Sequence, residues 1–300
     1  MAGPRAPDDQ LGLFGGAPPT TTDAPAAAAA PAHTPTTATA TATGPLKVAT
    51  WNVNGIRARH AQVIEWIARE QPDVVCLQEI KAPPAKIPPA LVEAVADYHA
   101  HWHGEGGYSG VALLLRRARF GDDVAFMHPP LDMEQRLVVA THGDLVFASV
   151  YIPNGGKDYK AKLRFLDELI EWAADLHARG QHLVLCGDYN VAHTDNDVHP
   201  TERRNVIGQL PAERRRLDAL FERGALVDVL RRSAPDDDRL FTWWAPWRQM
   251  RERNIGWRLD YIAAARALVD DETHGYAYRD VGTSDHGPVI AHLRATPAPR

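Results

Sequence analysis

The apolar residues of this chain are gathered in short runs of the length of a β-strand, and this pattern restricts the fold more than any other feature. The longest runs cover residues 111–115 and 146–152, well short of the roughly 18 residues that a membrane-spanning helix needs. Helical periodicity marks residues 60–70, 160–179 and 213–223. Many strands with few helices between them predict two packed sheets flanked by helices, an α/β architecture with no membrane span.

The strand and helix patterns alternate from Leu46 to Leu293 without an internal repeat. We expect strands at residues 46–51, 74–78, 108–116, 137–141, 145–152, 182–186, 259–263 and 288–293. The pattern therefore predicts a single folded domain over residues 46–300.

The composition changes abruptly before this domain. Residues 17–45 are almost entirely Ala, Pro and Thr and hold no large apolar side chain, so burial cannot offset the entropy of ordering them. We expect residues 1–45 to form a disordered tail with a flexible linker. The tail lacks the basic start and Leu-rich core of a secretory signal and the arginines of a mitochondrial one, which favours a cytoplasmic location.

Charge and cysteine content narrow the class of protein. A formal net charge of −5 offers no general attraction to nucleic acid or membranes, so local basic patches or metal ions must hold any anionic partner. Cys76 and Cys186 both lie in apolar runs. We expect them to be free core thiols in a reducing compartment, without a disulfide or metal role.

Polar side chains stand at the ends of several predicted strands. They include Asn52, Glu79, Asn154, Asp188, Asn190, Asp285 and His286. A single Gly-Asp-x-Asn segment is usually an ordinary turn. Five such strand ends in one domain, however, predict a functional site at one edge of the sheets.

These residues offer oxygen ligands with few His and no Cys, which suits Mg²⁺ or Mn²⁺. Mg²⁺ takes only one or two carboxylates besides waters and substrate phosphates, and Glu79, Asn52 and Asp285 fit that sparse set. Hydrolysis of a phosphodiester also needs an oriented water and charge stabilisation. Asp188 is the candidate for orienting or deprotonating the water. His286, with its ring held by Asp260, is the candidate for stabilising the charge that develops on the phosphate.

Seven motifs occur in order along the domain and carry a family resemblance. They are WNVNGIR at 51–57, LQEIK at 77–81, GYSGVA at 107–112, YIPN at 151–154, GDYNV at 187–191, NIGWRLDY at 254–261 and SDH at 284–286. Together they resemble the exodeoxyribonuclease III family of apurinic/apyrimidinic (AP) endonucleases, in the endonuclease/exonuclease/phosphatase superfamily.

The resemblance implies a four-layer α-β-β-α sandwich of two mixed sheets. It also implies an Mg²⁺-dependent DNA repair nuclease, with Mn²⁺ as a substitute, acting on duplex DNA. Nothing in the sequence asks for more than a monomer. Cleavage would fall 5′ of abasic sites, with 3′-to-5′ exonuclease and 3′-phosphatase activity alongside.

Carried over residue by residue, the resemblance gives the motif residues their roles. Glu79 matches the principal metal ligand, with Asn52 beside it, and Asp285 matches a further carboxylate of the metal site. Asp188 matches the residue that activates water, and Asn190 its neighbour in the same loop. Tyr151 matches the contact to the scissile phosphate, and His286 with Asp260 the hydrogen-bonded pair. The expected metal set is Asn52, Glu79, Asp188, Asn190, Asp285 and His286. An amide at residue 54, which is Asp in some members, weakens the case for an extra ligand there.

The resemblance also places a sugar pocket and phosphate contacts. Three residues match the apolar wall of a pocket for the base-less sugar: Trp243, Trp257 and Leu259. Such a wall would accept the small sugar and exclude a normal nucleotide by its size. Extrusion of the sugar from the duplex is easiest at an abasic site, because no base pair is lost there. Trp244 and Trp247 are instead expected in the core. Among the basic residues in or near the motif loops, Arg57 is expected to contact phosphates. Lys157 stands where the family can insert a side chain into the duplex.

A second motif precedes the linker. Residues 10–14 read Gln10, Leu11, Gly12, Leu13 and Phe14, and three large apolar side chains in a polar tail indicate burial by a partner. The pentapeptide resembles the binding motif for the bacterial sliding clamp. A micromolar contact of this kind, followed by a flexible linker, would act as a tether. An inert tail is the alternative.

Two other functions remain open on the sequence. One is a phosphodiesterase or phosphatase of the same superfamily that acts on lipid or inositol phosphates. The other is a clamp-tethered adaptor that binds damaged DNA without cutting it. The GWRLDY segment and the aromatic pocket argue against the first function. The second is disfavoured because an adaptor would not need the complete catalytic set of Glu79, Asp188, Asn190, Asp260 and His286.

Overall fold

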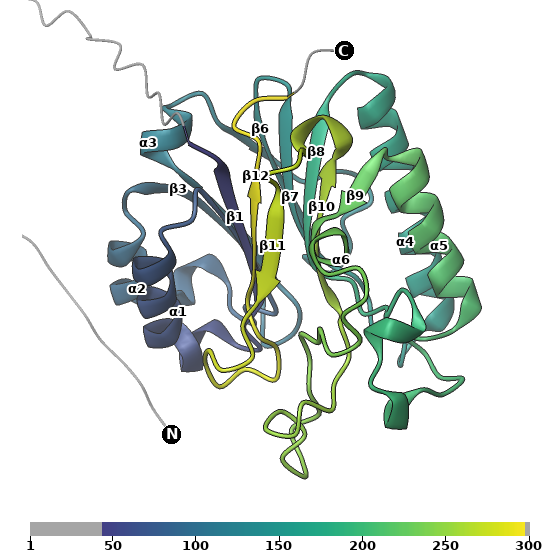
Figure 1. Cartoon of the computed structure of the whole chain (residues 1–300). Helices are drawn as coiled ribbons and strands as arrows, with labels where there is room; N and C mark the ends of the chain where they lie inside the picture. The colour runs from purple at the N-terminus through teal and green to yellow at the C-terminus, as the bar shows by residue number, and fades with distance from the viewer. Residues whose placement is uncertain (1–43, 298–300) are drawn as a thin grey trace, which may run out of the picture. The chain divides into compact units, whose positions relative to one another are not determined.

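The computed structural model describes residues 44–297. The tail up to residue 43, including the predicted clamp motif at residues 10–14, lies outside the described residues. Two six-stranded sheets pack face to face, and helices cover both outer faces (Figure 1). This is the predicted four-layer α-β-β-α sandwich.

The first sheet has the strand order β11-β12-β1-β2-β4-β3. Its strands are β1 (Leu46–Asn52), β2 (Val74–Gln78), β3 (Tyr98–His103), β4 (Val111–Arg116), β11 (His274–Ala277) and β12 (Val289–Leu293). β1 runs parallel to β2 and antiparallel to β12, so the first strand of the domain lies beside the last.

The second sheet has the order β5-β6-β7-β8-β10-β9. Its strands are β5 (Ala125–Met127), β6 (Leu137–His142), β7 (Leu145–Tyr151), β8 (His182–Asp188), β9 (Leu226–Asp228) and β10 (Asp260–Ala265). β7 and β8 are parallel, and β10 returns antiparallel to β8. Each sheet is therefore mixed, with one central parallel pair.

Helices α1 (Ile56–Glu70) and α2 (Pro89–Ala94) cover the first sheet, and α4 (Tyr159–Ala178) and α5 (Pro211–Arg223) cover the second (Figure 1). The remaining helical turns are α3 (Arg117–Phe120), α6 (Val229–Ser233), η1 (Pro84–Lys86), η2 (Asp195–Asp197), η3 (Pro200–Glu202) and η4 (Arg266–Leu268). None of the helices described here combines the length and apolar character that a membrane crossing requires.

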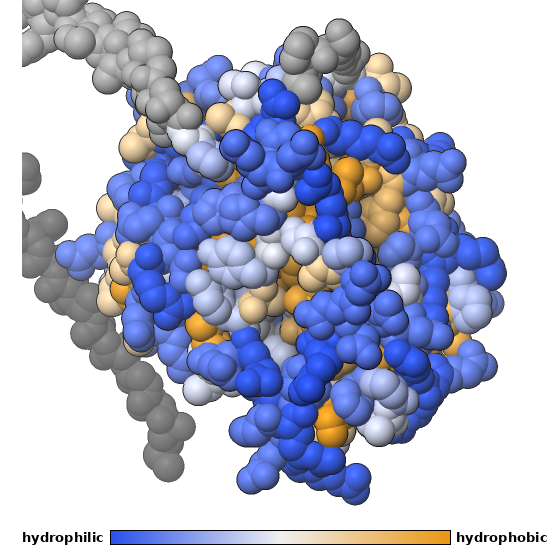
Figure 2. Space-filling model, in the orientation of Figure 1, coloured by the Kyte–Doolittle hydropathy of each residue, from blue (hydrophilic) through white to orange (hydrophobic). Residues whose placement is uncertain are grey.

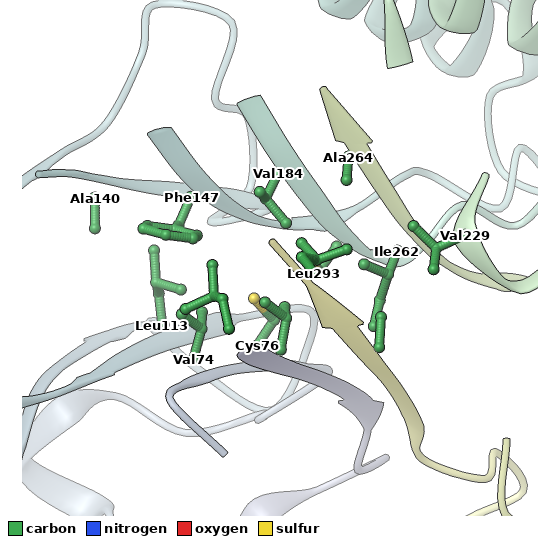
Figure 3. Close-up of a cluster of buried hydrophobic side chains, with 14 of the residues drawn as sticks. Val74, Cys76, Leu113, Ala140, Phe147, Val184, Val229, Ile262, Ala264 and Leu293 are labelled. Atoms are coloured by element: carbon green, nitrogen blue, oxygen red, sulfur yellow. The ribbon is translucent and has the colours of Figure 1, made fainter. Parts of the chain in front are cut away.

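The main core lies between the two sheets. Side chains such as Val74, Leu113, Phe147, Val184 and Ile262 meet there from opposite strands (Figure 3). Cys76 and Cys186 are buried in the same layer as free thiols, as expected. Alternating strand residues face this layer or an outer helix layer, which explains why the central strands read as continuous apolar runs.

Most predicted strands are present within a few residues of their expected ends, but the four edge strands β3, β5, β9 and β11 were missed. Edge strands are short and partly exposed to solvent, so their apolar runs are either broken by polar residues or too short to be recognised. In β3, for example, histidines alternate with other residues. Figure 2 shows a predominantly hydrophilic surface on the face in view.

Candidate active site

The topology brings the predicted site residues to one edge of the sandwich. β1 and β2 end there in the first sheet, and the parallel pair β7 and β8 ends there in the second. Because β10 runs antiparallel to β8, its first residue, Asp260, lies directly opposite Asp188. His286 precedes β12. The site is therefore assembled from both sheets.

Asn52 lies at the centre of this cluster and is fully buried. Its Nδ2 donates to Glu79 Oε1 at 3.0 Å and to Asp188 Oδ2 at 2.9 Å. The same nitrogen lies 3.4 Å from His286 Nε2. The amide thus joins the end of β1 to side chains of both sheets and fixes two carboxylates relative to the imidazole.

His286 and Asp260 form the predicted hydrogen-bonded pair. His286 Nδ1 lies 2.9 Å from Asp260 Oδ2, and its Nε2 faces Asp188 Oδ2 at 3.8 Å. Thr242, which the sequence analysis did not identify, positions Asp260, because its Oγ1 accepts the Asp260 backbone N–H at 3.0 Å. A threonine next to an aromatic run carries no sequence signal for this role.

Burial and mutual charge control protonation in the cluster. Burial raises the pKa of Asp188 to about 7; Asp260 and Glu79 add to the rise, whereas His286 opposes it. Burial alone would lower the pKa of His286, but the carboxylates of Asp260 and Asp188 outweigh it and raise that pKa to about 10. His286 is therefore an imidazolium at neutral pH.

Glu79 follows β2 and is only partly buried. Burial disfavours its charge, yet the hydrogen bonds from Asn52 and Lys81 leave its pKa below the usual value. Lys81 Nζ lies 2.6 Å from Glu79 Oε2 and 2.6 Å from Asn54 Oδ1. On the sequence, Lys81 was one of several basic residues in or near the motif loops that could contact phosphates. Its position two residues after Glu79 is the signal that could have placed it beside that carboxylate.

Tyr151 ends β7 beside these carboxylates. Burial, together with the charges of Glu79 and Asp188, raises the pKa of its hydroxyl far above the usual value. The guanidinium of Arg136, a buried residue that the sequence analysis missed, lies 4.7 Å from the centre of the Tyr151 ring. Tyr151 thus keeps its proton and can donate a hydrogen bond into the site.

Asn190 is held in the loop after β8 by its own backbone and side chain. Its backbone N–H donates to Asp188 Oδ1 at 2.9 Å, and its Nδ2 donates to the Ile152 carbonyl at 2.9 Å. The buried Lys162 of α4 donates to the Asn190 carbonyl at 2.8 Å and forms a buried ion pair with Glu213 of α5. Sequence reasoning missed this pair, although a lysine on the apolar face of a helix is an available signal.

Asp285 lies at the edge of the cluster. Its Oδ1 accepts from Asn54 Nδ2 at 2.8 Å, and its Oδ2 accepts from Trp243 Nε1 at 3.1 Å. Both oxygens are thus already bonded to neutral donors. Asp285 is not in the group of Asp188, Asp260 and His286, whose ligand atoms lie within 4.8 Å of one another.

A cavity of about 270 Å³ opens onto the cluster. Its wall joins catalytic candidates and aromatic residues: Glu79, Tyr151, Asn154, Asp188, Asn190, Ile207, Gly208, Trp243, Trp257, Leu259, Asp285 and His286. The rings of Trp243 and Trp257 meet edge to face, with centroids 5.6 Å apart. All three residues of the predicted sugar pocket therefore lie beside the carboxylates.

The remaining sequence predictions lie farther out. Lys157 is exposed and lines a neighbouring hollow that shares Asn154 with this cavity. Arg57 is exposed at the start of α1 and does not line the cavity. Trp244 is buried as expected, but Trp247 is 58% exposed, so its expected core position is wrong. Trp247 stands in a loop where Arg248 and Gln249 adopt left-handed backbone conformations, after which Met250 is buried again.

The chemistry of the cluster fits a divalent cation with oxygen ligands. Four carboxylates, Glu79, Asp188, Asp260 and Asp285, face only two cationic groups, Lys81 and His286. The Asp260 Oδ1 atom is buried without a hydrogen-bond partner, and the charges of Asp260 and Glu79 add to the burial that raises the pKa of Asp188. A cation held by the carboxylates of Glu79 and Asp188 would offset that excess. The Asn52 amide directs its nitrogen at both carboxylates, and its oxygen accepts the Asn54 backbone N–H at 3.0 Å.

Comparison with known proteins agrees with this geometry. The sequence profile of the Endonuclease/Exonuclease/phosphatase family matches residues 49–286. The chain belongs to this family. It is 33% identical to the DNA repair nuclease APEX1 of Danio rerio over 83% of its length and 82% of that protein. It is 30% identical to an exodeoxyribonuclease of Bacillus subtilis over 81% of its length and 98% of that protein.

Solved structures give the same result. An AP endonuclease from Archaeoglobus fulgidus superposes with a TM-score of 0.72 at 31% identity, over 83% of this chain and 99% of that one. A 3′ phosphatase from Neisseria bound to a product DNA hairpin gives a TM-score of 0.73 at 31% identity, with the same coverage. The resemblance to the exodeoxyribonuclease III type of AP endonuclease is thereby confirmed.

Proposed function

We propose that this chain hydrolyses the phosphodiester bond on the 5′ side of abasic sites in duplex DNA, with Mg²⁺ as its metal and with 3′-to-5′ exonuclease and 3′-phosphatase activity alongside. Its family and its relatives make it a metal-dependent DNA repair nuclease. The observation that carries the finer proposal is the shared cavity, in which the wall of Trp243, Trp257 and Leu259 adjoins the catalytic carboxylates.

That wall supports selection by shape. A deoxyribose without a base is small and has an apolar face, which the wall of Trp243, Trp257 and Leu259 would contact. Trp243 is fixed by its bond to Asp285 and by backbone pairing with His286. A sugar resting on Trp243 therefore places its 5′ phosphate beside Asp188 and His286, because those residues line the same cavity.

The chain's own residues have distinct tasks in the reaction. Asp188, kept in place by Asn52 and the Asn190 backbone, orients the attacking water and accepts its proton. His286, supported by Asp260, donates to a phosphate oxygen as negative charge develops there. Tyr151 adds a neutral donor, and Asn190 holds Asp188 in place. Bound Mg²⁺ supplies further charge stabilisation at the phosphate.

The decisive experiment is a gel assay on a duplex carrying one tetrahydrofuran abasic analogue, in Mg²⁺ and in EDTA. We expect nicking immediately 5′ of the analogue in Mg²⁺ only. Asp188→Asn should lower kcat by at least about 10²-fold with near-normal DNA binding, since it removes the proton acceptor. The exposed Asp158→Asn is the matched control. Cutting of an inositol phosphate but not of DNA would favour the other superfamily activity, and binding without cutting would favour an adaptor.

We also propose that residues 10–14 bind a bacterial sliding clamp. The support is the segment Gln10-Leu11-Gly12-Leu13-Phe14, which is followed by the Ala/Pro/Thr-rich linker. A peptide of residues 1–20 should bind purified clamp with micromolar affinity in a fluorescence titration, whereas the Leu13→Ala/Phe14→Ala peptide should not. Failure of the unmodified peptide to bind at high micromolar concentration would dismiss this tether.

A further inference from the structure

A second group of potential metal ligands lies where an edge strand of one sheet meets an edge strand of the other. It is separate from the catalytic cluster, by which we mean Asn52, Glu79, Asp188, Asp260 and His286. His101 and His103 alternate along β3, the edge of the first sheet, so their side chains share one face. His128 directly follows β5, the edge of the second sheet, and Asp132 stands in the next loop. We call these four residues the histidine cluster.

The ligand atoms of the histidine cluster converge. His103 Nε2 lies 2.6 Å from Asp132 Oδ2, and His101 Nε2 lies 3.1 Å from His128 Nε2. The rings of His103 and His128 have centroids 3.8 Å apart. One ligand atom from each of His103, His128 and Asp132 falls within 4.8 Å of the others. His101 lies outside this group of three and contacts it through His128, whose side chain is exposed.

The surroundings hold the ligands in position. Asp132 Oδ1 accepts the backbone N–H groups of Arg136 and Leu137 at 2.8 and 2.9 Å, which leaves Oδ2 directed at His103. The side chains of His103 and Asp132 are only 20% and 12% exposed. His101 stacks on Phe126 of β5 with centroids 5.1 Å apart. Hydrogen bonds and packing outside a metal site commonly orient its ligands in this way.

We propose that the histidine cluster binds a divalent transition-metal ion, Zn²⁺ foremost, and so joins the edges of the two sheets. Three imidazoles and one carboxylate form a four-ligand set that suits tetrahedral Zn²⁺. Ligands about 2.0–2.1 Å from such an ion lie roughly 3.3 Å from one another, close to the 3.1 Å between the His101 and His128 nitrogens. Because His101 lies outside the group of three, its imidazole must turn toward His103 and Asp132 to complete the geometry.

The two sites differ in their ligand chemistry. The catalytic cluster offers mainly carboxylate and amide oxygens, which suit Mg²⁺, whereas the histidine cluster offers mainly imidazole nitrogens, which suit Zn²⁺, Co²⁺ or Ni²⁺. The proposal therefore does not rest on the nuclease activity. A transition metal and Mg²⁺ can be assigned to separate sites in one experiment.

Metal binding would also tether the loop that leads to Arg136. The Arg136 backbone bonds to Asp132, and its side chain lies over the Tyr151 ring and donates to the Tyr108 hydroxyl at 2.7 Å. The metal would thus restrain a segment that packs against the catalytic cluster. Its primary effect is on the stability of the sandwich, since it binds only when β3 and β5 are in place.

The test uses the untagged full-length chain in buffer with millimolar Mg²⁺. Isothermal titration with Zn²⁺, and the visible absorption of bound Co²⁺, are measured for the wild type and for His103→Ala/His128→Ala. We expect the wild type to show one high-affinity Zn²⁺ event and the strong Co²⁺ bands of four-coordinate geometry, and the variant to lose both. His142→Ala, which alters a half-buried histidine outside the cluster, should keep both.

A thermal measurement complements the titration. At free Zn²⁺ about 100 times Kd, the melting temperature of the wild type should rise by about 5–10 °C, and that of the double variant should not rise. The conservative Asp132→Asn, which keeps the side-chain shape, should weaken Zn²⁺ binding while remaining folded. Equal Zn²⁺ stoichiometry and Co²⁺ spectra in the wild type and the double variant would place the metal at the catalytic cluster and overturn the proposal. Absence of any Zn²⁺ event in the folded wild type would overturn it as well.

Discussion

Four non-glycine residues around the catalytic cluster hold their backbones in the left-handed region. Asn54, Glu79, Lys81 and Asn190 have φ angles between 44° and 51°. Each such conformation costs about 1 kcal/mol or more. At Glu79 the conformation turns the chain sharply after β2, so that the side chain meets Asn52 instead of continuing along the strand. Strained backbone conformations thus occur at residues that position a ligand or a catalytic side chain.

Gly208 supports the sugar cavity at the same scale. Its φ is +92°, and a β-carbon there would lie 2.9 Å from the Trp257 ring and 3.3 Å from the Asn190 carbonyl. We expect Gly208→Ala to push Trp257 into the cavity and to lower kcat/KM on the tetrahydrofuran duplex roughly tenfold, a change that corresponds to about 1.4 kcal/mol. Gly106→Ala is the control, because no atom lies near that β-carbon. An unchanged kcat/KM in Gly208→Ala would show that Trp257 does not bound the sugar.

Among the elements, α4 and α5 do more than cover the second sheet. Lys162 of α4 and Glu213 of α5 are both fully buried and paired, and each bonds to a loop of the site. Lys162 donates to the Asn190 carbonyl, whereas Glu213 accepts the Gly208 N–H at 2.8 Å. The helix pair therefore fixes the loop after β8 and the glycine beneath Trp257 at the same time.

Lys162→Met should destabilise the fold by about 3 kcal/mol, because it leaves the buried Glu213 carboxylate without its cation. Urea unfolding followed by circular dichroism gives the free energy. Lys160→Met, an exposed position on the same helix, should change the free energy by less than about 0.5 kcal/mol. Adding Glu213→Gln to Lys162→Met should restore part of the lost free energy of unfolding, because it removes the unpaired buried charge. A single-variant cost close to that of Lys160→Met would show that the pair does not stabilise α4 against α5.

At the scale of the whole domain, a buried charge network joins loops that are distant in sequence. Asp197 Oδ1 accepts from Arg258 Nε at 2.7 Å and from Arg231 Nη2 at 2.6 Å, and Arg258 also pairs with Asp228 at 2.8 Å. The two arginines outweigh burial and hold the pKa of Asp197 far below its usual value. Because Arg258 adjoins Leu259 and Asp260, the network supports both the pocket wall and the catalytic pair.

This network makes a prediction about acid. Folding lowers the pKa of this carboxyl, so its ionised form stabilises the native state. This stabilisation is complete above the pKa of the unfolded chain, about 3.9 for Asp, and is lost as the pH falls below that value toward the folded-state pKa. Asp197→Asn should therefore lower the free energy of unfolding by about 3 kcal/mol at pH 7. The difference in free energy of unfolding between the variant and the wild type should become smaller below about pH 4. Urea unfolding across a pH series measures both. The neighbouring exposed Asp195→Asn should show neither effect. A difference that widens in acid would contradict the assignment.

The sequence was sufficient for the central strands, the long helices and the members of the catalytic cluster. These features depend on apolar runs, helical periodicity and short motifs, all of which are local in the chain. The edge strands and the supporting residues were not found in the same way. Lys162 and Glu213 acquire their role only when two helices pack together, and Thr242 acquires its role only when its hydroxyl reaches Asp260 across a turn. Asp285 shows the converse, because its motif was evident but its orientation toward Asn54 and Trp243 depends on tertiary packing.

The pairing of β1 with β12 has a consequence for the biosynthesis of this nuclease. β1 carries Asn52, and its partner on one side is the last strand of the domain, with His286 immediately before it. A growing polypeptide cannot complete the first sheet until the codons for β12 have been translated, and non-local pairing of this kind forms slowly. Every premature termination product that ends before residue 286 lacks the imidazolium. A potentially harmful DNA-cutting activity therefore arises only in the finished molecule.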